Sequence, residues 1–312
     1  MMSEMTTTSV LNSTFVRPDG FYIRGFYALQ HSNYYFIFLG VLYVATLLAN
    51  FLIMSIIWFA QSLHTPKYFG VFSLALVDVS YSTALIPKAL HMFLFGNRVV
   101  EYNACLTQMF FVHYFSGMES YTLMVLAYDR LIAICFPLRC TTINSNTKMM
   151  LVIIISWMIP FILILTMVGL VTRLSYCKST IVNSYFCDHG PVFLISCSDY
   201  SMNWFMAGFC VVALLYLPLA IIMLSYVVIL AAILRIPNTD GRRKAFKTCT
   251  THLTLVAIFY VPLLVIYIAP WLNRASLTKQ QLAHWVVDAI RLAYDNAKDP
   301  VPKHISAHST KG

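Results

Sequence analysis

Long runs without charged residues divide this 312-residue chain into segments of membrane-spanning length. A helix needs roughly 20 residues to cross about 30 Å of hydrocarbon, and four runs exceed that length without any Lys, Arg, Asp or Glu. Two further runs are each interrupted by one carboxylate, Asp78 or Glu119. Such lengths favour helices, because the strands of a membrane barrel show only about ten alternating residues. We therefore predict six membrane-spanning helices, near residues 33–60, 68–91, 104–131, 151–171, 204–234 and 249–272.

The overall composition supports this pattern. Hydrophobic residues make up 59% of the chain and charged residues 11%, whereas an ordinary soluble domain is roughly 25% charged. We therefore predict an integral membrane protein of the all-α class. Residues 1–32 lack the apolar core of a secretory signal, so we expect an extracellular arm and a first helix that acts as the insertion signal. Asn12 begins an Asn-Ser-Thr triplet and is the predicted glycosylation site of this arm.

Basic residues gather in the loop that follows the fifth predicted helix. The loop holds five of them against one acid, Asp240: Arg235, Arg242, Arg243, Lys244 and Lys247. Cytoplasmic loops carry such an excess, so the N-terminus is expected outside. We attribute the net charge of +9 mainly to this topology and to contact with anionic lipids. Nucleic acid is not an expected partner, because the basic residues are scattered among loops rather than gathered on one face.

The eight cysteines divide between the two sides of the membrane in this topology. Four face the oxidising side, where two disulfides are possible: Cys105, Cys177, Cys187 and Cys197. Four lie within the membrane or on the reducing side: Cys135, Cys140, Cys210 and Cys249. A zinc site is the competing interpretation, but the ten-residue spacings match no C-x2-C pattern.

Four sequence motifs carry a resemblance to a known family. They are HTPKYFGVFSLALVD at His64–Asp78, LAYDRLIAICFPLRC at Leu126–Cys140, YFCDHGPVFLISCSDY at Tyr185–Tyr200 and KAFKTCTTHL at Lys244–Leu253. With them the chain resembles an odorant (olfactory) receptor of the rhodopsin-like G-protein-coupled family as far as about Trp271, and several segments are similar to fish receptors. The resemblance implies a rhodopsin-like helical bundle at the plasma membrane. It also implies a small-molecule odorant and a heterotrimeric G protein of the olfactory stimulatory type as partners.

The resemblance assigns roles to cysteines and to polar residues inside the bundle. Two disulfides are implied, and they would make the long outer loop a lid over the ligand site: Cys105–Cys187 and Cys177–Cys197. A polar network is implied at Asn50, Asp78 and Glu119. The two carboxylates could hold a sodium ion or share a proton, because neighbouring carboxylates raise each other's pKa. The alternative is that hydrogen bonds satisfy each of them separately. No other cofactor is expected.

Arg130 is the residue on which the resemblance places signalling. Asp129 beside it can form an ion pair that holds it in the inactive state, and an outward movement of helix six would let a G protein contact it. The implied switch also includes residues near the inner ends of helices five and six: Tyr226, Lys244, Lys247 and His252. The alternative is an interfacial arginine without a signalling role, because Lys and Arg snorkel at helix ends. Prolines are expected to kink helices four, five and six, at Pro160, Pro218 and Pro262.

A stripe along the third predicted helix is the candidate ligand site. Its members recur at helical spacing: Met109, Val112, His113, Ser116, Gly117 and Ser120. The resemblance implies that this stripe lines the odorant pocket, with walls from helices five and six at Phe209, Phe259 and Tyr260. Ordinary helix packing explains such a stripe about as well for any single member. His113 is the sharpest candidate, because a lone donor and acceptor in an apolar pocket can orient a small polar ligand.

The last 40 residues depart from the family. They show neither a seventh apolar span nor an Asn-Pro-x-x-Tyr motif. The segment near 281–294 is too short to span and has one apolar face, so it is predicted to be an amphipathic helix within an atypical tail, 274–312. With six spans, both termini would lie outside.

Three functions therefore remain open. The first is an odorant receptor that binds small molecules in the outer half of the bundle and activates a G protein through helices three, five and six. The second is a non-signalling truncated or mispredicted variant retained in the endoplasmic reticulum. An ion channel or transporter is a remote third, with Asp78 and Glu119 on the ion path. An enzyme is not expected, since no nucleophile and base, metal set or phosphate loop stands out.

Overall fold

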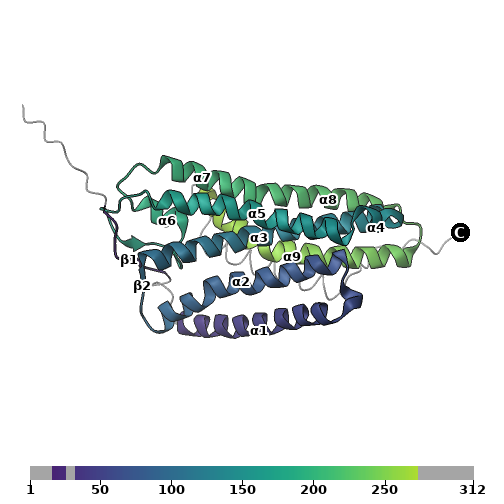
Figure 1. Cartoon of the computed structure of the whole chain (residues 1–312), viewed down its shortest axis with the longest axis horizontal. Coiled ribbons are helices and arrows are strands. Elements are labelled where there is room, and N and C mark those ends of the chain that lie inside the picture. Colours follow the sequence, from purple (N-terminus) through teal and green to yellow (C-terminus); the bar gives the residue numbers. More distant parts are fainter. Residues whose placement is uncertain (1–15, 26–31, 273–312) are drawn as a thin grey trace, which may run out of the picture. The chain divides into compact units, whose positions relative to one another are not determined.

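Six long helices dominate the computed structural model, which describes residues 16–25 and 32–272 (Figure 1). They are α1 (Ser32–Phe59), α2 (Pro66–Leu94), α3 (Tyr102–Cys135), α5 (Asn146–Val171), the continuous run of α7 (Ser201–Val211), η3 (Val212–Tyr216) and α8 (Leu217–Leu234), and α9 (Thr239–Leu272). A backbone in hydrocarbon must satisfy its own hydrogen bonds, which explains why apolar runs of this length are helical. The predicted helical membrane class is confirmed. The predicted glycosylation site, Asn12, and the predicted helix near 281–294 lie outside the described residues.

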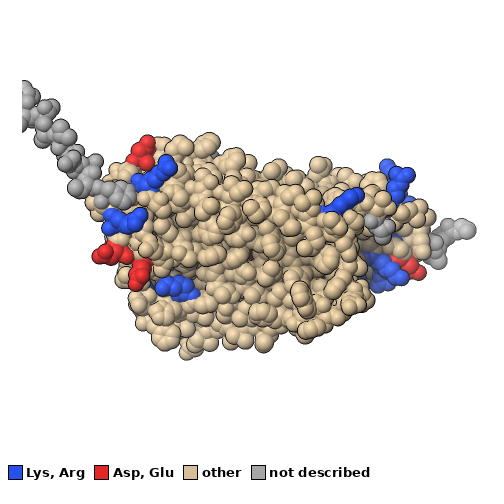
Figure 2. Space-filling model, in the orientation of Figure 1, with Lys and Arg blue, Asp and Glu red and all other residues tan. Residues whose placement is uncertain are grey.

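Five helices in the described part of the chain are long and apolar enough to cross a membrane: Tyr34–Phe59, Pro66–Leu94, Asn146–Val171, Ser201–Leu234 and Thr239–Val265. The 34-residue α3, which carries Glu119, Asp129 and Arg130, is not in this set. Large apolar side chains on the outer faces of the helices are exposed, among them Leu48 at 67% and Val227 at 65%. In Figure 2 the visible surface along the helices is almost uncharged, and charged side chains gather near the helix ends. A surface of this kind matches lipid as its solvent.

Shorter helices lie in the connections, namely η1 (Gln61–Leu63), η2 (Pro137–Arg139), α4 (Cys140–Ile143) and α6 (His189–Leu194). The described chain divides into two compact units. The first unit comprises residues 16–25, 32–48, 79–115 and 161–210, and the second unit comprises residues 49–78, 116–160 and 211–272.

A small sheet in the first unit adds strands that the all-α prediction does not include. Its order is β2 (Val99–Glu101), β1 (Gly20–Ile23) and β3 (Ile181–Val182), with β1 antiparallel to β2 and parallel to β3. Phe21 and Ile23 are fully buried, while Tyr22 between them is 40% exposed, as alternation along a strand requires. Gly20 is needed for close pairing, because a Cβ there would lie 2.6 Å from the carbonyl oxygen of Val100.

The second unit has a hydrophobic core formed by α3, η3, α8 and α9. Its buried members are Leu123, Ala127, Leu215, Ile222, Tyr226, Ile229, Ile233, Cys249, Val256 and Tyr260. Two of them, Tyr226 and Tyr260, bring hydroxyl groups into this apolar region, and both hydroxyls are hydrogen-bonded to side chains of the same unit. The core therefore joins helix packing to specific polar contacts between helices.

The helix around Pro218 is irregular, as its sequence predicts. Immediately before it, Val212–Tyr216 forms wider i→i+5 turns, because a proline lacks the N–H that would continue the ladder. The hydroxyl of Tyr121 on α3 donates to the carbonyl oxygen of Ala213 in these turns, at 3.2 Å. A side chain of α3 thus supplies a donor to the irregular turn.

Candidate functional site

The Asp129–Arg130 pair lies at the end of α3 in the second unit. Nη2 of Arg130 lies 3.4 Å from Oδ2 of Asp129, and the two side chains are only 13% and 7% exposed. Nδ2 of Asn144 donates to the other carboxylate oxygen of Asp129, at 2.8 Å. Asn144 follows α4 and is 4% exposed. Asp129 is therefore held from both sides, and Asn144 is a member of this site that the sequence motifs do not reveal.

A second polar contact in the same unit joins α8 to α9. The hydroxyl of Tyr226 and Nδ1 of His252 are 2.8 Å apart, and their rings stack with centroids 5.7 Å apart. Tyr226 and Cys249 belong to one buried core, which also includes Ala127 of α3. Of the predicted switch residues, Tyr226 of α8 and His252 of α9 are thus in contact, and Lys244 and Lys247 are exposed on the same α9.

The predicted polar network also belongs to the second unit. The carboxyl groups of Asp78 and Glu119 are near enough to interact electrostatically, and both Asn50 and Asp78 have polar partners. Among the described residues, no group of three or more His, Cys, Asp or Glu side chains could hold a metal ion. A sodium ion here would need further ligands from carbonyl oxygens, hydroxyls or water.

Two disulfides secure the outer loop in the first unit. Cys105 at the start of α3 is bonded to Cys187, and Cys177 is bonded to Cys197, with Cα atoms 5.2 Å and 5.7 Å apart respectively. These are the pairs that the family resemblance implies. The remaining cysteines of the described chain are free thiols: Cys135, Cys140, Cys210 and Cys249.

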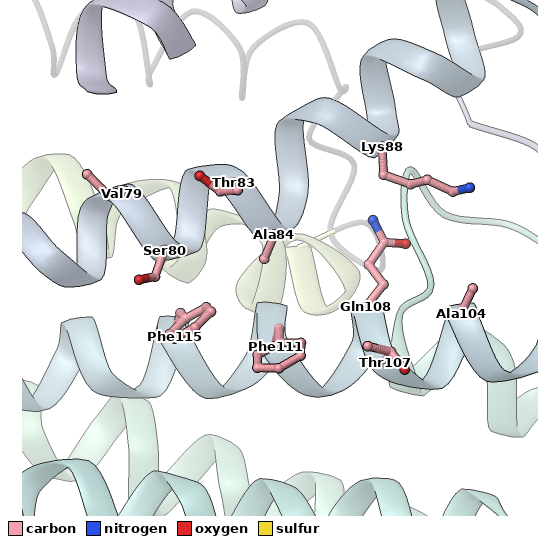
Figure 3. Close-up of a pocket in the computed structure, with 10 residues that line it drawn as sticks. All are labelled: Val79, Ser80, Thr83, Ala84, Lys88, Ala104, Thr107, Gln108, Phe111 and Phe115. Carbon is pink, nitrogen blue, oxygen red and sulfur yellow. The ribbon is translucent and has the colours of Figure 1, made fainter. Parts of the chain in front are cut away.

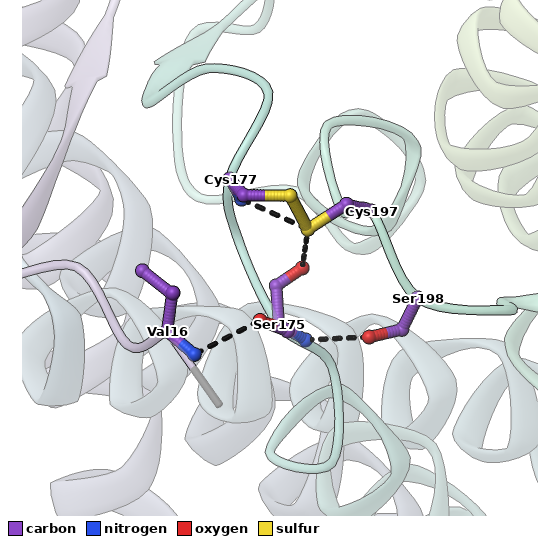
Figure 4. The surroundings of a disulfide bond; sticks show 5 residues. All are labelled: Val16, Ser175, Cys177, Cys197 and Ser198. Carbon is purple, nitrogen blue, oxygen red and sulfur yellow. Dashed lines mark hydrogen bonds between the residues drawn. A yellow bond between two sulfur atoms is a disulfide. The ribbon is translucent and has the colours of Figure 1, made fainter. Parts of the chain in front are cut away.

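The N-terminal arm is tied to the second disulfide (Figure 4). The backbone N–H of Val16 donates to Oγ of Ser175 at 2.9 Å, and the N–H of Ser175 donates to Oγ of Ser198 at 2.9 Å. The N–H of Cys197 in turn donates to the carbonyl oxygen of Ser175 at 2.9 Å. Arm and loop therefore form one hydrogen-bonded surface around Cys177–Cys197.

An ion pair joins the loop to α3 beside the first disulfide. Nδ1 of His113 donates to the carbonyl oxygen of Met109 at 2.9 Å, and Nε2 lies 3.2 Å from Oδ1 of Asp188. Both partners are acceptors, so the imidazolium form, which carries two N–H groups, fits this geometry. The two ring nitrogens that were expected to orient a ligand are already engaged. A ligand can use His113 only by displacing Asp188.

The surroundings of Asp188 determine the charges on the loop. Burial raises the pKa of its carboxyl, but the hydrogen bond and charge of His113 outweigh burial and leave the pKa below its usual value. The neighbouring His189 is 2% exposed, and burial together with the charge of His113 lowers its pKa to about 4. The loop therefore holds an ionised carboxylate next to a neutral histidine at neutral pH.

The other predicted ligand-pocket residues occupy different environments. In the first unit Met109 and Val112 are buried, at 0% and 3% exposed, whereas Phe209 is 47% exposed. In the second unit a Cβ added to Gly117 would lie 3.0 Å from Cβ of Pro160, so Gly117 marks a close helix crossing. There the hydroxyl of Tyr260 is hydrogen-bonded to Ser120 at 2.7 Å, and the ring of Phe259 packs edge-on against it. Ser116 is half-buried in the same unit.

A cavity of about 650 Å³ lies between α2 and α3 in the first unit (Figure 3). The described residues that line it are Val79, Ser80, Thr83, Ala84, Lys88, Ala104, Thr107, Gln108, Phe111 and Phe115. None of them belongs to the predicted ligand stripe. Pro87 lies within α2 and removes a backbone donor, and Figure 3 shows α2 stepping away from α3 between Ala84 and Lys88. The sequence shows Pro87 and Lys88 within the second predicted helix but does not mark this cavity.

Comparisons with known proteins identify the family. The olfactory receptor family model matches residues 39–300. Human olfactory receptor 6C1 is 35% identical over 245 residues, which cover 78% of this chain and 78% of that protein. Human olfactory receptor 51F2 is 35% identical over 271 residues, covering 85% and 78%, and mouse olfactory receptor 1M1 is 36% identical over 242 residues, covering 78% and 77%. With its apolar helices, the protein is a multi-pass membrane protein. The chain belongs to the olfactory receptor family, a family of G-protein-coupled receptors and not of enzymes.

Proposed function

We propose that this protein is an odorant receptor of the plasma membrane that activates a stimulatory heterotrimeric G protein. The observation that supports this most directly is the arrangement around Arg130, whose partner Asp129 is also held by Asn144. An arginine held in a partly buried ion pair at a helix end is shielded from other molecules. Once the pair opens, its guanidinium can bind a partner protein. The proposed G-protein contact is formed by Arg130 with the inner ends of α8 and α9.

The Tyr226–His252 contact supports the same proposal from the opposite helices. If α9 moves outward, the 2.8 Å contact between these two side chains must break or rearrange. The exposed Lys244 and Lys247 on α9 would then provide positive charge toward an acidic or carboxyl-terminal segment of the partner. The switch we propose is therefore the joint release of Arg130 from Asp129 and of His252 from Tyr226.

For the odorant we propose binding in the outer half of the bundle. The predicted stripe on α3 supplies Met109, Val112, His113, Ser116 and Gly117, with Phe209, Phe259 and Tyr260 as predicted walls. The lid, fixed by two disulfides and by the His113–Asp188 ion pair, supports a ligand site beneath the outer loop.

We further propose that Asn50, Asp78 and Glu119 hold a sodium ion or share one proton. The electrostatic interaction of the two carboxyl groups supports this, because two adjacent anions in low dielectric need a cation between them. Replacing sodium by choline tests it: ligand affinity should change in the wild type and not in Glu119→Gln. Equal sodium dependence in both would contradict a site that includes Glu119.

A cell assay tests the main proposal. Odorant-evoked cAMP and surface expression are measured for the wild type, for Arg130→Ala and for Arg139→Ala, an exposed arginine of η2. We expect the Arg130 variant to reach the surface and lose the cAMP response, and the Arg139 variant to respond like the wild type. Unchanged signalling in Arg130→Ala would refute the proposed role of this residue.

The sequence supports one alternative, a variant that does not signal. No Asn-Pro-x-x-Tyr motif occurs in the chain, and a receptor of this family uses that motif in its switch. Retention of the wild type in the endoplasmic reticulum, without cAMP response to a broad odorant panel, would favour this alternative. Any robust odorant response at the cell surface would exclude it.

A further inference from the structure

The cavity between α2 and α3 contains two hydrogen-bond donors near one end. Oε1 of Gln108 accepts a hydrogen bond from the backbone N–H of Cys187, at 3.3 Å, which fixes the amide with its oxygen toward the lid. The Nε2 of the same side chain is buried and has no hydrogen-bond partner among the described residues. Gln108 is 8% exposed, and Figure 3 shows its amide directed into the cavity. A buried amide donor without a partner is unfavourable, so this group indicates a ligand acceptor.

Lys88 lines the same end of the cavity from α2 (Figure 3). It is half-buried, and no acid in the described part of the chain lies within ion-pair distance of it. The described residues of the lining include no Asp or Glu, so their formal charge is positive. The hydroxyls of Thr83 and Thr107 already bond to Tyr43 and to the carbonyl oxygen of Asn103, and Ser80 has a partner as well. Lys88 and Gln108 therefore supply the remaining side-chain donors of the described lining.

The rest of the lining is mainly apolar. Phe111 and Phe115 from α3 lie opposite α2, which adds Val79 and Ala84 to the apolar lining. Gln108 and Phe115 are seven residues apart on one helix, which corresponds to about 10 Å along its axis. The volume of about 650 Å³ falls within the range of small-molecule sites, roughly 300 to 1,000 Å³. The cavity therefore matches a ligand with an anionic head and an aliphatic tail of medium length.

We propose that this cavity binds medium-chain aliphatic monocarboxylic acids, with the carboxylate on Lys88 and Gln108 and the tail along Phe111 and Phe115. This assignment rests on the proposed odorant-receptor function and adds a second ligand site, whose described lining shares no residue with the predicted stripe on α3. A carboxylate accepts from the ammonium and the amide at once, so both donors are satisfied by one group. A neutral alcohol of equal length would leave the charge of Lys88 without a counterion.

The test measures binding to the full chain in phosphatidylcholine nanodiscs at neutral pH, with octanoate and octan-1-ol as probes and empty nanodiscs as the partition control. We expect octanoate to bind at least about tenfold more tightly than octanol, since a hydrogen-bonded charge contributes that much. Lys88→Met should reduce this preference to less than about twofold. Gln108→Glu should also reduce it, because the carboxylate still accepts from Cys187 but repels the ligand. Lys178→Met, an exposed lysine outside the cavity lining, should retain the preference.

Three results would overturn the proposal. The first is equal affinity of the wild type for octanoate and octanol, and the second is an unchanged preference in Lys88→Met. The third is a lower melting temperature of ligand-free Lys88→Met while octanoate stabilises neither protein, which would give Lys88 an internal partner instead. Signalling is a separate readout. Octanoate binding without a cAMP response would contradict the proposed receptor function alone, and a cAMP response to other odorants without octanoate binding would contradict this inference alone.

Discussion

Asn144 fixes the position of Asp129 beside Arg130. Its amide occupies one carboxylate oxygen at 2.8 Å while Arg130 lies 3.4 Å from the other, so the carboxylate is positioned by a neutral residue of the following loop. A hydrogen bond to a charged group contributes about 1.5–3 kcal/mol. The carboxylate that pairs with Arg130 is therefore positioned partly by a residue outside the Asp-Arg motif.

Asn144→Ala should raise ligand-independent signalling. Losing the hydrogen bond lets Asp129 leave Arg130 more often, and we expect a roughly tenfold larger released fraction. The measurement is basal cAMP divided by surface expression. Asn146→Ala is the matched control, because Asn146 is exposed and donates to the carbonyl oxygen of His64 instead. Basal signalling that is equal in the two variants would contradict this role of Asn144.

Protonation of His189 should weaken the lid in mild acid. Its pKa is about 4 in the folded loop and near 6.5 in an unfolded chain. Between these values the unfolded state binds a proton that the folded state does not, so stability falls as the pH drops from about 6.5 toward 4. Asp188, with its lowered pKa, stays ionised throughout this window. The melting temperature of the wild type should fall from pH 7 to pH 5 more steeply than that of His189→Gln. Parallel curves would show that His189 does not contribute.

At the scale of elements, the close helix crossing at Gly117 limits the size of the side chain that α3 can have at this position. A Cβ on Gly117 would meet Cβ of Pro160 at 3.0 Å and Cδ1 of Leu214 at 3.4 Å. The proline ring cannot rotate away, so the helices themselves would have to separate. Gly117 is thus explained by close packing, whatever further contact it makes with a ligand.

Gly117→Val should destabilise the protein by about 1–3 kcal/mol through overpacking. Gly169→Ala on α5 is the control, because a Cβ there meets nothing within 4 Å and alanine favours a helix by up to about 1 kcal/mol. Melting temperatures in nanodiscs should therefore move in opposite directions. A Gly117→Val protein as stable as the wild type would show that the crossing is loose.

Helices and contacts differ in how far the sequence predicts them. The long helices follow from apolar length, because hydrocarbon leaves the backbone no other partner. Strand β1 cannot be predicted in this way, because four residues are too few to show an alternating pattern. Its partner strands also lie about 80 and 160 positions away in the sequence. The sequence likewise shows Asn144 only as a polar loop residue, and its role is seen when the structure places Asp129 beside it. For the cavity, Pro87 and Lys88 stand in the second predicted helix without marking a site, and only the structure places Lys88 in one lining with Gln108.

At the scale of the whole molecule, the two disulfides should differ in importance. Cys105–Cys187 joins residues 82 positions apart and Cys177–Cys197 joins residues 20 apart. Loop-closure entropy gives about 4.5 and about 3 kcal/mol respectively. Replacing both cysteines of a pair by serine should therefore lower surface expression and melting temperature more for Cys105–Cys187. Cys135→Ser, a free thiol in the structure, is the control. A larger loss for the Cys177–Cys197 pair would mean that the shorter disulfide loop contributes more to the stability of the outer loop.

The small sheet also determines when, during synthesis, the outer surface can finish folding. β1 contains some of the first described residues of the chain, yet Ile23 pairs with Val182, which is translated about 160 residues later. At 5–20 residues per second this interval is roughly ten to thirty seconds. During that time β1 has an unpaired edge that chaperones or another strand can bind. Completion of this sheet is thus a late event of synthesis, because β1 waits for the outer loop that carries β3.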